Sequence, residues 1–195
     1  MKTDDLVRIR RETGCSAVLS LQHDLCLAHW RIDFDRLQNR AVELGVVLVR
    51  CPIRDFDVED MRRQLPHAVA TLAALQSSGH RTYVHCTAGL GRAPLVVLTY
   101  LILVERLDPE DAISMILAGR PAAVPAWEAY RGCRHDLVEH NRGAIARRAY
   151  QLSLQGTNRC EDADWLQAET EVLREDMLTH RNGMLTESGD GNTIL

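Results

Sequence analysis

The segment from His85 to Arg92, with the sequence HCTAGLGR, combines a cysteine, two glycines and an arginine. It follows a predicted strand, Thr82–His85, and precedes an almost uniformly apolar segment at 93–106 that predicts a buried helix. A glycine-bearing turn between a strand and a helix directs backbone N–H groups and the positive end of the helix dipole toward one point. We therefore expect this turn to bind an anion such as phosphate, through the following residues: Thr87, Ala88, Gly89, Leu90, Gly91 and Arg92.

Cys86 lies at the base of this predicted loop, where positive surroundings favour the thiolate, the nucleophilic form of cysteine. The planar guanidinium of Arg92 can hold two phosphate oxygens at once, which a lysine cannot do. The same donors would stabilise charge on the phosphoryl group in the transition state. The chemistry that follows is thiolate attack on phosphorus, then hydrolysis of the cysteinyl-phosphate by water.

The leaving alkoxide of such a reaction needs a proton from a general acid. Asp55 and Asp57 follow the second predicted strand, so both should lie at the same edge of the sheet as Cys86. Either aspartate could instead cap the next helix, although Asp60 is the stronger candidate for that cap. The residues alone leave the choice of acid open.

Other site chemistries fit the sequence less well. A buried cysteine in a strand-to-helix turn can be inert, and the arginine six positions after Cys86 is what favours catalysis. The loop lacks the third glycine of a dinucleotide-binding turn. Cys26 with His29, and Cys133 with His135, lack the paired ligands of a zinc site. We therefore expect no metal and no cofactor.

Strands and helices alternate through the first half of the chain, which predicts an α/β fold with a small, mainly parallel sheet covered by helices. The predicted strands are 17–21, 46–49 and 82–85, and the predicted helices are 4–13, 33–44, 60–78 and 93–106. Beyond residue 107 only helices are expected, at 109–118, 126–140, 143–154 and 162–178. We predict a catalytic domain over 1–142, a helical C-terminal extension over 143–179, and a disordered tail over 180–195.

The block His85–Pro94, together with Gln22–Asp24 and Cys51–Asp57, resembles the dual-specificity branch of the protein tyrosine phosphatase superfamily, and within it the phosphoglucan phosphatases. The resemblance spans about residues 5–140. It implies that Asp55 is the general acid, with Asp57 as the fallback. It also implies that His85 orients the loop, and that a glucan chain binds through the following residues: Phe56, Trp30 and His29.

Several positions depart from the pattern of that family. Ala93 stands where many protein phosphatases have a hydroxyl residue, which favours a carbohydrate substrate. Val124 stands where the glucan-binding members often carry an aromatic residue, which weakens that assignment. The strands that usually precede the first helix have no counterpart, so a sheet edge could be exposed. The C-terminal part resembles a short bacterial helical domain of unknown function.

Composition excludes some partners. A net charge of −4 does not favour a nucleic-acid-binding protein, and the apolar run Leu95–Val104 is too short to cross a membrane. The acidic segment Met1–Asp5 lacks the apolar core of a signal peptide, so a cytoplasmic location is expected. The predicted substrate is a phosphorylated glucan, with a phosphoprotein or phosphoinositide as the alternative. A module that only binds phosphate or glucan is a second alternative, and the oligomeric state stays open.

Overall fold

The computed structural model describes residues 1–155 and 160–187, and a three-stranded parallel sheet lies at its centre. The strands are β1 (Ala17–Gln22), β2 (Val47–Ile53) and β3 (Thr82–His85), in the order β2-β1-β3. Every residue of β1 is buried, because this strand is paired on both sides and covered on both faces. The predicted fold class is therefore confirmed.

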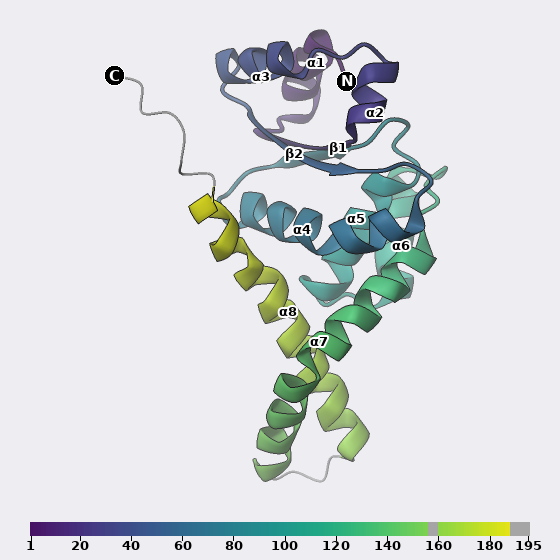
Figure 1. Ribbon diagram of the computed structural model, residues 1–195, viewed down its shortest axis with the longest axis vertical. Coiled ribbons are helices and arrows are strands. Elements are labelled where there is room, and N and C mark those ends of the chain that lie inside the picture. The colour runs from purple at the N-terminus through teal and green to yellow at the C-terminus, as the bar shows by residue number, and fades with distance from the viewer. Residues whose placement is uncertain (156–159, 188–195) are drawn as a thin grey trace.

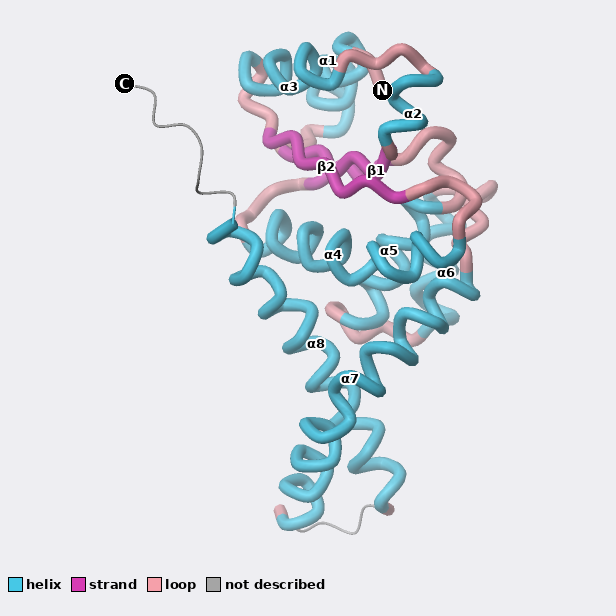
Figure 2. Tube along the Cα trace, viewed as in Figure 1, coloured by secondary structure: helices cyan, strands magenta, loops and turns pink. Residues whose placement is uncertain are grey.

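Helices cover both faces of the sheet, as Figures 1 and 2 show. Above the sheet in Figure 1 lie α1 (Thr3–Thr13), α2 (Asp24–His29) and α3 (Phe34–Glu43). Below it lie α4 (Val58–Ser77), α5 (Arg92–Leu103), α6 (Pro109–Gly119), α7 (Trp127–Leu154) and α8 (Glu161–Glu187). The short helix α2 was not predicted from the sequence.

Alternation along β1 divides the core between these two layers. Val18 packs with α1 and α3, in a cluster that includes Leu6 and Leu37. Leu19 and Leu21 face the larger cluster on the other side of the sheet, built with α4 and α5. The helix α5 is apolar around most of its circumference because it lies inside this larger cluster.

The two helices predicted at 126–140 and 143–154 form one continuous helix, α7, so the predicted interruption is wrong. Gly143 favours a break by its intrinsic helix propensity. Packing overrides that preference, because the side-chain amide of Asn141 donates to Leu137 O and to Asp176 of α8, both at 2.9 Å. The boundary that we predicted at residue 142 therefore lies inside a helix.

Helix α8 folds back along α7 and then reaches the body of the molecule (Figure 1). Leu173 and Met177 are almost completely buried in the main core, against α4 and α5. The helix runs to Glu187, so it overlaps the start of the predicted disordered tail, and residues 188–195 lie outside the described part of the chain. The C-terminal helices thus complete the apolar core beneath the sheet.

Candidate active site

The loop between β3 and α5 wraps around the sulfur of Cys86. The side chain of Cys86 is buried, and its Sγ accepts a hydrogen bond from the backbone N–H of Gly89 at 3.3 Å. Gly89 has a φ of 70°, a left-handed conformation that glycine adopts without steric cost. Gly91 precedes α5 as its N-cap, so the loop ends at the positive end of a buried helix.

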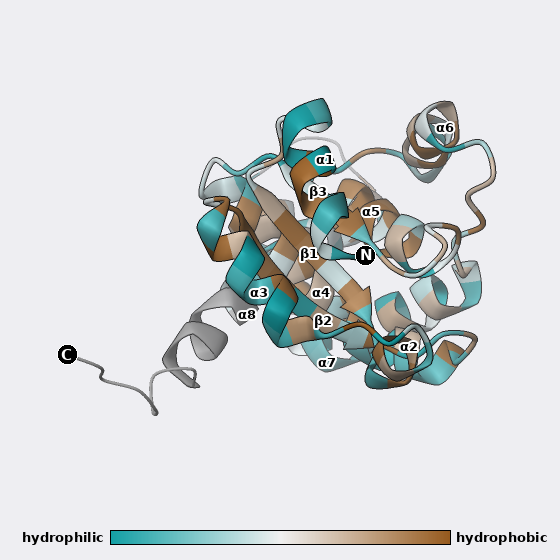
Figure 3. Ribbon diagram, turned by 90° about the horizontal axis from the view of Figure 1, so that it is seen from above, coloured by the Kyte–Doolittle hydropathy of each residue, from teal (hydrophilic) through white to brown (hydrophobic). Residues whose placement is uncertain are grey.

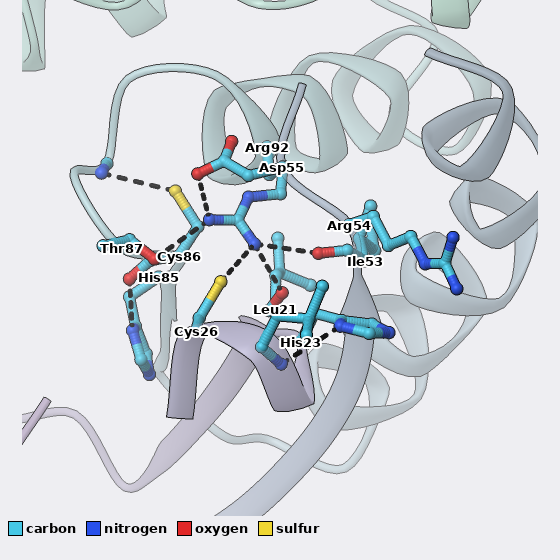
Figure 4. Close-up of polar contacts among 12 residues, drawn as sticks. Leu21, His23, Cys26, Ile53, Arg54, Asp55, His85, Cys86, Thr87 and Arg92 are labelled. Carbon is cyan, nitrogen blue, oxygen red and sulfur yellow. Dashed lines mark hydrogen bonds and ion pairs between the residues drawn. The ribbon is translucent and has the colours of Figure 1, made fainter. Parts of the chain in front are cut away.

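Arg92, in the first turn of α5, is 1% exposed and points back across the loop (Figure 4). Its Nη1 donates to Ile53 O at 2.8 Å and to Leu21 O at 3.3 Å, at the carboxyl ends of the two neighbouring strands. Its Nη2 donates to Thr87 Oγ1 at 3.0 Å. These bonds fix the guanidinium beside the loop, with one edge directed at the place where an anion would lie.

Asp55 provides the anion that Arg92 contacts in this structure. Its carboxylate lies 2.6 Å from Arg92 Nη2 and is partly exposed, whereas the guanidinium is fully buried (Figure 4). The three predicted catalytic residues, Cys86, Arg92 and Asp55, therefore meet in one place. A phosphate group entering the loop must take over the hydrogen bond that Asp55 now accepts.

The predicted helix cap is wrong, because Asp57 and not Asp60 caps α4. Asp57 accepts from the N–H of Asp60 at 2.9 Å, and Asp60 is buried and accepts from the N–H of Arg54 at 2.7 Å. The two carboxylates close a small turn that fixes the direction of the segment carrying Asp55.

His85 is held behind the loop by a hydrogen bond between its Nδ1 and the carbonyl of Cys86, at 2.9 Å. Because a carbonyl oxygen only accepts, Nδ1 carries the proton and Nε2 is an acceptor. Burial lowers the pKa of His85 to about 4, so the ring is neutral at physiological pH. This geometry fits the expected loop-orienting role.

We expect His85 to make folding pH-dependent. The folded pKa of about 4 lies below the unfolded value of 6.5, so the unfolded chain binds a proton first as the pH falls. The contribution of His85 to stability is complete above pH 6.5 and falls by up to about 3 kcal/mol as the pH decreases to 4. Urea unfolding of wild type and His85→Gln across this range measures the difference. Equal pH slopes for the two proteins would contradict the prediction.

Two hydrogen bonds that support the loop were not predicted from the sequence. Arg120, which follows α6, donates through Nη2 to Ala88 O at 2.9 Å. The N–H of Val124 donates to Leu90 O at 2.7 Å, while its side chain is largely exposed. The segment after α6 therefore supports the phosphate-binding loop from outside. These hydrogen bonds join segments that are distant in the sequence, so no short sequence motif predicts them.

Cys26, on α2, is a second thiol beside the guanidinium. Its Sγ lies 3.5 Å from Arg92 Nη1. Burial raises its pKa, but hydrogen bonds from Thr87 and Arg92 outweigh this effect, so the pKa of Cys26 lies below its usual value. The position of Cys26 just after the carboxyl end of a buried strand is the only sequence signal that could have placed it here.

A pocket of about 380 Å³ opens beside Asp55 and Thr87, and His29 and Trp30 line it. Trp30 is 56% exposed, so its ring faces the pocket and solvent and is not a core residue. Its ring packs edge-on against His29, with 5.0 Å between centroids. Phe56 is not among the residues that line this pocket. It is 95% exposed and has a φ of 59°.

The described residues include no group of three His, Cys, Asp or Glu side chains arranged to hold a metal ion. Within the same part of the chain, no helix has the length and apolarity that a bilayer crossing requires.

Comparisons with known proteins agree with this geometry. Residues 32–142 match the dual specificity phosphatase catalytic domain. The chain is 32% identical over 140 residues to the amyloplastic phosphoglucan phosphatase DSP4 of Castanea sativa, covering 71% of this chain and 37% of that protein. It is 29% identical over 142 residues to mouse laforin, covering 68% of this chain and 43% of laforin. The chain thus spans less than half the length of these curated relatives.

Among solved structures, the active form of Tk-PTP superposes with a TM-score of 0.54 and 26% sequence identity. The superposition covers 69% of this chain and 86% of that one.

Proposed function

Because the chain belongs to the dual specificity phosphatase catalytic domain family, we propose that it hydrolyses phosphate monoesters through a cysteinyl-phosphate, acting on phosphorylated glucan. The observation that carries the reaction is the convergence of Cys86, Arg92 and Asp55 around one loop. The substrate class is supported by the relatives, two of which are named phosphoglucan phosphatases. Their names also place them in amyloplasts or chloroplasts, so the cytoplasmic location stays a prediction.

In the proposed reaction, the phosphate dianion displaces the carboxylate of Asp55 from Arg92 and lies between the guanidinium and the loop N–H groups. Cys86 Sγ attacks phosphorus in line with the leaving oxygen, and the ester bond breaks as the S–P bond forms. Once free of the ion pair, Asp55 takes a proton from solvent and gives it to the leaving alkoxide. Water then attacks the cysteinyl-phosphate while the Asp55 carboxylate accepts the water proton, the P–S bond breaks, and inorganic phosphate, the Cys86 thiolate and protonated Asp55 are released.

Two exposed aromatic residues support the choice of a glucan. Trp30 presents its ring at the pocket beside Asp55. Phe56 holds a left-handed backbone conformation, which is unfavourable for a bulky residue, and its side chain is almost fully exposed. Strain of this kind is often retained at binding sites. Both rings offer flat apolar faces of the type on which sugars stack.

Replacing Asp55 with Asn tests the general acid. We expect Asp55→Asn to lose about 10²–10³-fold in kcat on a phosphate ester with a poor leaving group, such as a sugar, because the alkoxide then departs unprotonated. The loss on an aryl phosphate with a good leaving group should be much smaller. Asp57→Asn is the matched control, since Asn also caps a helix. If the control shows the leaving-group dependence instead, Asp57 is the acid.

Replacing Trp30 with Ala tests the substrate. We expect Trp30→Ala to reduce phosphate release from phosphorylated starch by about tenfold in kcat/KM, through loss of roughly 1.4 kcal/mol of stacking. The loss on p-nitrophenyl phosphate should be less than about twofold. Tyr150→Ala removes another exposed aromatic side chain far along α7 and serves as the control. Wild-type protein that cleaves the aryl phosphate and leaves phosphorylated starch intact would refute the glucan assignment.

A further inference from the structure

The outer edge of β3 is open. Arg81 O accepts from the N–H of Ala17 in β1, so by alternation the main-chain groups of Tyr83 also face β1, and those of Thr82 and Val84 face outward. Among the hydrogen bonds of the described residues, none reaches these outward groups. An edge of this kind presents donors and acceptors that match only another extended backbone.

A groove of about 600 Å³ runs along this edge and continues to the phosphate-binding loop, whose residues 86–89 also line it. Its two sides differ in chemistry. The α5 and α6 side is apolar, with Val97, Leu101, Met115 and Ile116, whereas the α1 side carries Asp5 and Arg8. In Figure 3, which looks down on the molecule from above, α6 lies to one side of β3 and α5. A strand added to β3 would therefore place alternate side chains against an apolar and a polar surface.

His85 supplies an independent sign that this groove receives a ligand. The residue lines the groove and is 7% exposed, yet its Nε2 has no hydrogen-bond partner among the described residues. Since Nδ1 is the donor to Cys86 O, Nε2 is a buried acceptor that no donor of the described residues reaches. A buried polar atom left without a partner is costly, and a hydroxyl side chain on an added strand would satisfy it.

The net charge of the groove favours a ligand of the opposite charge. Asp5 and Arg8 form an ion pair at 3.3 Å and offset each other. Arg120, which also lines the groove, donates to a carbonyl and forms no ion pair with any carboxylate of the described residues. The groove therefore carries an excess of positive charge that an acidic residue complements.

We propose that the edge of β3 is a docking site for an extended, acidic segment of a partner polypeptide, which adds to the sheet as a fourth strand. The segment alternates apolar side chains, directed at α5 and α6, with polar side chains directed at α1 and His85. The inference does not depend on the substrate of the phosphatase.

The probe is the labelled peptide acetyl-Glu-Val-Thr-Val-Glu-amide, with binding followed by fluorescence anisotropy on the full chain. We expect a Kd on the order of 100 µM and slowed amide exchange at Thr82 and Val84. An analogue methylated on its backbone nitrogens keeps every side chain but loses the N–H donors, and it should not bind. A Gln-for-Glu analogue should bind several-fold more weakly.

Met115→Glu places a like charge on the apolar side of the groove and should weaken binding at least about tenfold. Leu117→Glu, on the same helix but outside the groove, should bind the peptide within about twofold of wild type. The proposal is overturned if the methylated analogue binds equally well. It is also overturned if exchange slows elsewhere but not in β3, or if no saturable binding occurs at ~1 mM peptide.

Discussion

Cys86→Ser is expected to abolish turnover, with a loss of at least about 10⁴-fold in kcat on every substrate. A serine hydroxyl fits the same position beneath the N–H of Gly89, but it is a far weaker nucleophile than a thiolate at neutral pH. The phosphate-binding loop and Arg92 stay in place, so the variant should still bind substrate. Single-turnover assays and equilibrium binding of phosphorylated starch measure the two properties separately.

The control for this variant is Cys160→Ser, which changes an exposed thiol far from the loop and should keep wild-type activity. Turnover retained by Cys86→Ser would identify a different nucleophile, and Cys26 would be the first to test, because it lies beside the same guanidinium. Binding without turnover in the wild-type protein would instead favour a module that only recognises phosphate or glucan.

Arg92→Lys is expected to lower kcat/KM by about 10³-fold although the charge is conserved. An ammonium group cannot contact Ile53 O, Thr87 and the anion at the same time, as the planar guanidinium does. The transition state therefore loses a donor pair that is already oriented in the free protein, and each such donor contributes about 10²–10³ in rate. The same change should lower the melting temperature, since buried carbonyls lose their partners.

Arg62→Lys provides the comparison, because Arg62 forms an exposed ion pair with Asp136 on another face. That variant should keep full activity, as surface ion pairs contribute little. Arg92→Lys activity within a few fold of wild type would show that a simple positive charge suffices. The interpretation that Arg92 acts through the fixed, planar arrangement of its donors would then fail. The assignment of Cys86 as the nucleophile would be unaffected.

The arrangement of Cys86 and Arg92 could be predicted from the sequence because it depends on neighbouring elements of the chain. A strand, a glycine turn and a buried helix between Thr82 and Leu103 are enough to place Cys86 against Arg92. Asp55 could be placed as well, since carboxyl ends of parallel strands meet at one edge of the sheet. The buried and β-branched runs also located all three strands, to within a few residues at their ends.

What escaped prediction depends on contacts between distant segments. The hydrogen bond from Arg120 to Ala88 and the approach of Cys26 to Arg92 join residues far apart in the sequence. The continuity of α7 through Gly143 depends on Asn141 bonding to α8. In the same way, Asp57 and not Asp60 caps α4, while the carboxylate of Asp60 accepts from the backbone N–H of Arg54. In each case, contacts between distant segments outweighed the structural preference of the local sequence.

The insertion of Leu173 and Met177 beneath α4 has a consequence for how the molecule can be divided. The part of the chain that matches the family ends at residue 142, in the middle of α7, whereas the apolar core also includes residues of α8. The border of the family match and the border of the packed core therefore do not coincide. Truncating the chain to the part that matches other phosphatases would remove Leu173 and Met177 from the core and expose the apolar residues that pack against them. This would happen even though the removed residues lie far from the reacting sulfur.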